Sequence, residues 1–368
     1  EEKQECLGTA PLGKLMRKFA VPCTISLLVG ALYNIVDQIF IGWGVGYLGN
    51  GATSVVFPLT VLALGLAVMI GDGAGSFVSI CFGKQNVKDA NRAVGNAVTL
   101  SVLVGIVVMV LYYIFRDPLL ALFGATEANL PYARDYFAWI AAGIPIYVFG
   151  QAANPLIRAD GSPNFAMGCM LAGAVTNVIG DPIAIFVFHG GVVGAAIGTL
   201  AARTVECGIV CVYVFCRDRK LQLRAAELGR SDPALRGDYF RTSVPIVLQA
   251  AMWGVLNAIQ TAILGHMTAS AVAAYSISST AFLLLKVTAV GACTAASIMV
   301  GKQIGSGGKQ LRTMVYTMQL LFVGLGATLG IVLFFLRIPL LRVYRISDET
   351  RYLANAFFLI QCVVGLTR

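Results

Sequence analysis

The stretch AVGNAVTLSVLVGIVVMVLYYIF, residues 93–115, decides the fold class, because it contains no charged residue and is framed by Arg92 and Arg116. A helix needs about 20 apolar residues to cross the ~30 Å hydrocarbon core of a bilayer. Similar blocks recur along the 368 residues, of which 58% are hydrophobic and 12% charged, whereas soluble domains have about 25% charged residues. The sequence therefore predicts an all-α polytopic membrane protein and excludes both a disordered chain and an ordinary soluble enzyme.

Ten apolar segments are long enough, or nearly long enough, to cross a bilayer. They cover residues 17–43, 53–82, 91–115, 131–157, 163–188, 191–216, 239–266, 269–301, 311–336 and 351–367. The longest polar segment, which is rich in Arg, separates the sixth span from the seventh and is too short to be a domain. We therefore expect an N-terminal six-helix lobe over residues 14–216, a basic cytoplasmic linker over 217–237 and a C-terminal lobe over 238–368.

The formal net charge of +9 is carried by the loops between the apolar segments. The loops on the side of the N-terminus hold most of the Lys and Arg, such as Lys84 and Lys88, and the opposite loops hold few. Because positive loops remain inside, the N-terminus is predicted to be cytoplasmic in a multi-pass protein of the inner (plasma) membrane. No nucleic-acid-binding motif accompanies the basic residues, so we expect no nucleic-acid partner.

The two halves of the chain resemble each other. A shift of 223 residues places Ala20-Val21-Pro22 on Ser243-Val244-Pro245 and Asp37 on Gln260, and a shift of 218 places Gly83-Lys84-Gln85 on Gly301-Lys302-Gln303. Six spans separate the copies, so both enter the membrane in the same direction, as parallel repeats about an axis along the bilayer normal. The repeat predicts two six-helix bundles with twelve helices in full, of which ten lie in this sequence and two are expected to follow Arg368.

Polar residues inside the apolar segments are the candidates for function, because an ionisable group in hydrocarbon costs at least ~2.5 kcal/mol. Asp37 lies in the first span, and Asn177 and Asp181 lie four residues apart on one face of the fifth. Pro182 leaves the Val178 carbonyl without its usual helix partner, and Thr199 in the sixth span lies at a similar depth. This cluster suits a proton or a small cation, because two carboxylates cannot comfortably be charged in one dry site. The alternative to an ion site is a purely structural set of buried polar contacts that hold the helices together.

Further charged residues lie inside the apolar segments. Arg203 and Glu206 are three residues apart in the sixth span and are interpreted as a structural ion pair, and Lys286 is the buried charge of the second copy. No catalytic constellation or metal-ligand spacing accompanies them. We therefore expect neither an enzyme nor a cofactor, and no metal site except for Na⁺ at Asp37, Asn177 and Asp181.

Several stretches together resemble the multidrug and toxic compound extrusion (MATE) transporters. They are Tyr33 to Gly42 in the first span, Leu156 to Gly161 after the fourth, Asn177 to Pro182 in the fifth and Gly191 to Ala196 before the sixth. The resemblance covers nearly the whole chain. It implies twelve helices in two lobes and exchange of H⁺ or Na⁺ for amphipathic, often cationic compounds.

The resemblance also implies residue roles. The ion-coupling residues would be Asp37, Asn177 and Asp181, with Thr199 beside them, and a fourth-helix amide would be Gln151 or Asn154. Another branch of the family has an essential seventh-helix glutamate, which the stretch Gln249 to Trp253 lacks, so coupling is expected in the N-terminal lobe. The residues expected to line the substrate cavity are Tyr33, Asn34, Gln151, Asn154, Gln260 and Lys286.

These expectations combine into one hypothesis, a monomeric multidrug antiporter that works by alternating access and contributes to antibiotic resistance. Its partners would be small-molecule drugs or metabolites, membrane lipids and a coupling ion, with H⁺ favoured over Na⁺. The alternative is a flippase for a lipid-linked or polar cell-envelope precursor. A flippase would depend on basic cavity residues, for which Lys286 and Arg203 are the candidates.

Overall fold

The computed structural model describes residues 12–216, 269–308, 311–343 and 348–364, together with isolated positions between 237 and 263. In these ranges every regular element is a helix. The long helices are α2 (Leu12–Gly44), α3 (Tyr47–Gly83), α4 (Val87–Ile114), α6 (Leu130–Ala159), α7 (Pro163–Pro182), α8 (Gly191–Cys211), α10 (Ala269–Gly305), α11 (Leu311–Val343) and α12 (Asp348–Val364). A short helix, α5 (Arg116–Leu122), follows α4, and π-helical turns extend α7 over Ile183–Val187 and α8 over Val212–Cys216.

Within the described residues, eight helices are long and apolar enough to cross a membrane. They confirm the first six predicted spans and those predicted at 269–301 and 311–336. The span predicted at 239–266 lies largely outside the described residues. The last predicted span corresponds to α12, which has 17 residues in the described part of the chain.

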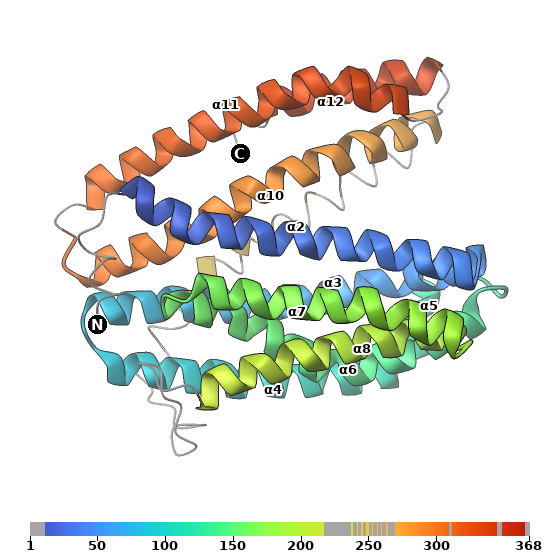
Figure 1. The fold of residues 1–368 in the computed structure, drawn as a ribbon, viewed down its shortest axis with the longest axis horizontal. Helices are drawn as coiled ribbons and strands as arrows, with labels where there is room; N and C mark the ends of the chain where they lie inside the picture. The colour runs from blue at the N-terminus through green and yellow to red at the C-terminus, as the bar shows by residue number, and fades with distance from the viewer. Residues whose placement is uncertain are drawn as a thin grey trace.

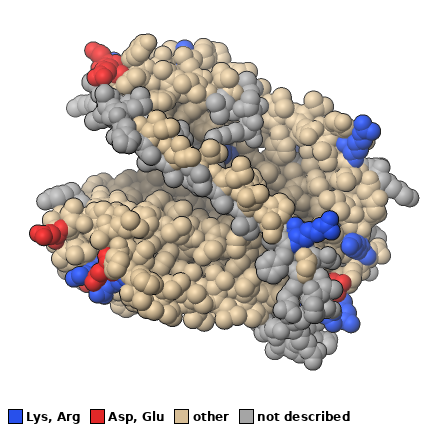
Figure 2. Space-filling view, turned by 180° about the vertical axis from the view of Figure 1, so that it is seen from behind, with Lys and Arg blue, Asp and Glu red and all other residues tan. Residues whose placement is uncertain are grey.

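The long helices lie side by side in two groups, α3 to α8 and α10 to α12 (Figure 1). Helix α2 lies between the groups and packs against α7 on one side and α10 on the other. The surface is hollowed between the groups, and most of the body is uncharged (Figure 2). Lys and Arg gather at the end where α3 passes into α4, whereas acidic and basic residues mix at the opposite end. Charges at both ends of an uncharged body are typical of a membrane-spanning bundle.

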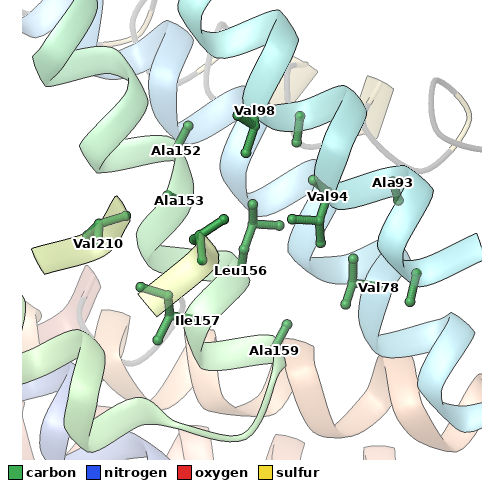
Figure 3. Packing of buried hydrophobic residues seen from close by; sticks show 14 of the residues in the cluster. Val78, Ala93, Val94, Val98, Ala152, Ala153, Leu156, Ile157, Ala159 and Val210 are labelled. Atoms are coloured by element: carbon green, nitrogen blue, oxygen red, sulfur yellow. The ribbon is translucent and has the colours of Figure 1, made fainter. Parts of the chain in front are cut away.

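Small apolar side chains let the helices of the first group approach one another closely. One buried cluster joins Val78 of α3, Val94 of α4, Ala153 and Leu156 of α6 and Val210 of α8, all at most 2% exposed (Figure 3). Tight packing of this kind is what holds helices together in lipid, where no hydrophobic force drives their association.

Helix α5 was not predicted from the sequence, because its seven residues are too few for a periodic signal. It is connected to the first turns of α6, where Arg134 Nε donates to Asp117 Oδ1 at 3.0 Å. Within α5, Arg116 Nε donates to the same atom at 3.2 Å. The hydrogen bond from Arg134 is the main reason that the pKa of Asp117 is lowered from its usual value.

Corresponding ends of the two repeats meet where α3 crosses α10. A Cβ atom on Gly83 would lie 2.1 Å from the Lys302 carbonyl oxygen, and one on Gly305 would lie 2.0 Å from the Ile80 carbonyl oxygen. Nearby, the hydroxyls of Ser76 and Ser297 are 3.3 Å apart. Equivalent segments related by a two-fold axis contact each other on that axis. The crossing therefore supports the repeat inferred from the sequence, and it requires glycine because backbone lies against backbone.

We expect Gly305→Ala to force α3 and α10 apart and to lower the free energy of unfolding by about 1–3 kcal/mol, the usual cost of overpacking. The matched control is Gly324→Ala in α11, where a Cβ atom meets nothing within 4 Å and alanine is the better helix former. Thermal melting of the purified variants in detergent measures the difference. Equal melting temperatures for the two variants would contradict the close crossing.

Candidate functional site

The structure brings together the polar residues that the sequence placed in the first and fifth spans. Asp37 of α2 is 7% exposed, and Asn177 and Asp181 of α7 are 2% and 0% exposed. The carboxyl groups of Asp37 and Asp181 lie close enough to interact. Within the described residues, both oxygens of Asp181 and Oδ1 of Asp37 are buried without a hydrogen-bond partner. A buried oxygen atom without a partner is costly, and these atoms can accept a proton or contact a cation.

Two neighbouring side chains complete this cluster. Asn177 Nδ2 donates to Thr199 Oγ1 of α8 at 3.5 Å, which confirms that Thr199 lies beside the α7 residues. Tyr136 of α6 interacts with Thr199 and lies near both carboxyl groups. Tyr136 was not predicted from the sequence, because a tyrosine in an apolar helix gives no signal that separates a site residue from a packing residue. We call Asp37, Tyr136, Asn177, Asp181 and Thr199 the carboxylate cluster.

The local backbone shapes this cluster. The α-helical geometry of α7 ends at Pro182, as expected for a residue that cannot donate a backbone hydrogen bond, and a π-helical turn follows over Ile183–Val187. Gly198 of α8 faces Asp181, and a Cβ atom there would lie 2.1 Å from Asp181 Oδ1 and 3.2 Å from its Cα. The missing side chain at position 198 therefore leaves the space that the Asp181 carboxyl group occupies.

A cavity of about 190 Å³ opens beside the carboxylate cluster. Asp37, Tyr136 and Thr199 belong to its wall, as do Tyr33 and Asn34, two of the predicted cavity residues. Its other lining residues include the aromatic side chains Phe57, Trp139 and Tyr147 and the cation Arg203. A mostly apolar and aromatic wall with a few converging polar groups is typical of small-molecule sites.

The predicted ion pair between Arg203 and Glu206 is confirmed, with Arg203 Nη1 3.0 Å from Glu206 Oε2. Arg203 also donates to the Tyr33 hydroxyl, and its guanidinium lies over the Tyr147 ring at 4.7 Å from the ring centre. A second cavity of about 10 Å³, room for about one water molecule, is lined by Asn177, Thr199, Arg203 and Glu206, among others. The ion pair therefore lies within the same set of helices as the carboxylate cluster.

The remaining predicted residues lie elsewhere. Gln151 donates to Glu206 Oε1 at 3.3 Å, and Asn154 donates to the Ala166 carbonyl at 3.2 Å and so ties α6 to α7. Neither amide, nor the half-buried Lys286 of α10, lines these two cavities. Gln260 lies outside the described residues. Of the two fourth-helix amides, Gln151 is thus connected to the ion pair and Asn154 to helix packing.

The chemistry of the carboxylate cluster suits H⁺ or an alkali cation. No group of three or more His, Cys, Asp or Glu residues that could hold a metal ion occurs in the described part of the chain. The cluster instead combines carboxyl, amide and hydroxyl oxygen atoms, which are hard ligands. It can exchange protons, and its unpartnered oxygen atoms would also fit Na⁺.

The chain is similar to several known proteins. The sequence profile of the MatE family matches residues 22–183 and 245–366. The multidrug export protein MepA of Staphylococcus aureus (strain MSSA476) is 26% identical over 269 residues, which is 73% of this chain and 59% of the relative. The alignment thus spans less than two thirds of that protein's length. An FAD transporter of Shewanella oneidensis is 24% identical over 98% of this chain and 80% of its own.

The fold also matches solved structures. An outward-facing structure of a multidrug resistance MATE family transporter superposes with a TM-score of 0.88, covering 96% of this chain and 79% of the other. The sequence identity is 22%, so this likeness concerns the fold.

We expect Gly198→Ala to displace the Asp181 carboxyl group and to lower the free energy of unfolding by about 1–3 kcal/mol. Adding Asp181→Ala removes the atoms nearest to the new Cβ and should restore part of this loss. A double-mutant cycle from thermal melting measures the coupling, with Gly208→Ala as a control where a Cβ atom meets nothing within 4 Å. Additive effects of the two substitutions would show that Gly198 and Asp181 are not in contact.

Proposed function

The chain belongs to the MatE family of membrane transporters, and we propose that it exports small amphipathic compounds in exchange for protons. The observation that carries this proposal is the buried pair Asp37 and Asp181, which adjoins an aromatic cavity at Asp37. If the two carboxyl groups only held the helices together, their oxygen atoms would accept hydrogen bonds from neighbouring donors. Three carboxylate oxygen atoms of the pair have no such partner among the described residues.

The proposed exchange follows from electrostatics. With a carboxylate ionised, the cavity attracts the cationic group of a compound such as ethidium. A proton that reaches Asp37 or Asp181 forms an O–H bond and cancels this charge, so the compound binds more weakly and leaves. A potential of 100 mV contributes about 2.3 kcal/mol for each charge moved across the membrane, which is enough to support a useful gradient of the exported compound.

Proton coupling involves residues of both α2 and α7. Asp37 and Asp181 are the proposed proton acceptors. Asn177 and Tyr136, which both contact Thr199, are proposed to adjust their hydrogen bonds when the carboxyl groups gain or lose a proton. Sodium remains the second candidate, with Asp37, Asn177 and Asp181 as its ligands. The π-helical turn after Pro182 is a candidate hinge, because such turns often occur at functional sites.

The substrates are proposed to be drugs or metabolites of moderate size. The relatives named above are a multidrug export protein and an FAD transporter, which supports small-molecule cargo. A flippase would need several basic cavity residues. Arg203 is the cation that lines the large cavity within the described residues, and it is paired with Glu206. The geometry therefore supports small-molecule export over lipid flipping.

We propose that the protein acts as a monomer in the plasma membrane, with the basic end of Figure 2 in the cytoplasm. This orientation places Ser306 inside and Asp117 outside. In a cysteine-free background, we expect Asp117→Cys to react with a membrane-impermeant maleimide in whole cells and Ser306→Cys to react only after lysis. The reverse labelling pattern would overturn the orientation.

We expect Asp37→Asn to reduce ethidium efflux into a medium of imposed low pH by about tenfold or more, because an amide cannot take up the proton. The matched control is Asp117→Asn, which alters an exposed carboxylate far from the cavity and should keep normal efflux. Vesicles with ΔpH or ΔNa⁺ imposed separately identify the coupling ion. Normal efflux by well-expressed Asp37→Asn at every pH would refute the coupling role, and efflux driven by ΔNa⁺ alone would refute proton coupling.

A further inference from the structure

Arg203 presents a positive charge to the cavity wall, while its counter-ion is turned away from it. The side chain of Arg203 is 19% exposed and that of Glu206 is 3% exposed. Arg203 lines the large cavity and Glu206 does not. Glu206 instead lies among α6, α7 and α8, where Gln151 donates to its Oε1 and Gly173 leaves room for its side chain. A ligand in the large cavity therefore meets the cation of this pair.

The guanidinium group of Arg203 is held in place and has donors to spare. Its central carbon, Cζ, lies over the Tyr147 ring at 4.7 Å and over the Tyr33 ring at 5.3 Å from their centres. It has five N–H donors, and in the described part of the chain two contacts use them, one to Glu206 and one to Tyr33. Arginine binds carboxylate and phosphate groups through paired N–H donors, and stacking on aromatic rings fixes its orientation.

The cavity is consequently bipolar. Asp37 and Arg203 line the same cavity, and the wall includes the aromatic side chains of Tyr33, Trp139 and Tyr147. A purely cationic compound uses Asp37 and gains nothing from Arg203, whose charge repels it. A planar compound with an anionic group as well as a cationic one satisfies both charges and stacks on the aromatic wall.

We propose that the cavity selects aromatic compounds that carry an anionic group, a carboxylate or a phosphate, and that Arg203 binds this group. The inference rests on the proposed export function for its biological meaning. The binding selectivity itself depends only on the residues of the cavity and can be measured without transport. The negative charge of Glu206 weakens the attraction between Arg203 and an anionic group in the cavity. Removing the charge of Glu206 therefore strengthens binding of the anionic group, whereas a purely structural ion pair would be weakened without any gain in binding.

The experiment uses two fluorescent ligands that differ in one group. Rhodamine 110 has a free carboxylate beside its cationic ring system, and rhodamine 123 is its methyl ester. Fluorescence anisotropy gives their dissociation constants for the purified full chain in detergent. Arg203→Gln combined with Glu206→Gln removes both charges together, so that no unpaired charge is left buried. Glu206→Gln alone keeps Arg203 and serves as the second variant.

The unsubstituted chain should bind rhodamine 110 more tightly than its ester, and the double variant should lose about tenfold in affinity for the acid, the value of a charge-assisted hydrogen bond. Affinity for the ester should change by less than threefold. Glu206→Gln alone should tighten binding of the acid by about threefold or more. Equal changes for acid and ester in the double variant, or weaker binding of the acid by Glu206→Gln, would overturn the proposal.

These outcomes are separable from those of the proposed function. Failure of the acid-over-ester preference leaves ethidium efflux and its dependence on Asp37 unaffected, and refutes only the substrate class. Normal efflux by Asp37→Asn refutes the coupling role while the binding constants for the two rhodamines still test Arg203.

Discussion

The packing of α2 against α7 is dominated by the cost of placing two carboxyl groups side by side away from water. A buried ionised carboxylate needs a counter-charge or several donors, and Asp37 and Asp181 have each other as neighbours and three oxygen atoms without partners among the described residues. The negative charge of the pair must be cancelled by a proton or balanced by a cation. A proton and a cationic compound can each do this, which is the physical reason for proposing that one replaces the other.

The helix packing around this pair follows from small residues. Gly198 allows α8 to approach Asp181, and Gly173 makes room for Glu206. Larger residues at these positions would fill the space with carbon and separate α7 from α8, as overpacking does in other tightly packed interiors. The same glycine-mediated contact recurs at Gly83 and Gly305 between the repeats. Gly198 and Gly173 lie against acidic side chains, and Gly83 and Gly305 lie against backbone atoms. The cluster of Figure 3 instead packs aliphatic side chains against one another.

Much of the fold could be predicted from the sequence, because each helix that crosses the hydrocarbon core of the bilayer must be about 20 residues long and mostly apolar. Asp37, Asn177, Asp181 and Thr199 were readable for the same reason, since polar groups stand out in apolar segments. Other residues gave no such signal. Tyr136 looks like any buried aromatic residue, and spacing alone paired Arg203 with Glu206 without revealing which of them lines the cavity. The choice between Gln151 and Asn154 depended on helix rotation, which a pattern does not fix to within one residue.

The two halves that resemble each other in sequence differ in their charges. The shift that aligns the halves places Asp37 on Gln260, and an amide can neither lose nor gain a proton at ordinary pH. The second copy therefore cannot repeat the exchange chemistry proposed for Asp37 at the equivalent position. It can still act as the body against which the first group moves, because α10 packs against both α2 and α3. A change in the charge of Asp37 on α2 would be transmitted first to α7 and α10, the two helices that flank it. We therefore propose that the charge state of the carboxyl groups on α2 and α7 changes how these helices pack against α10.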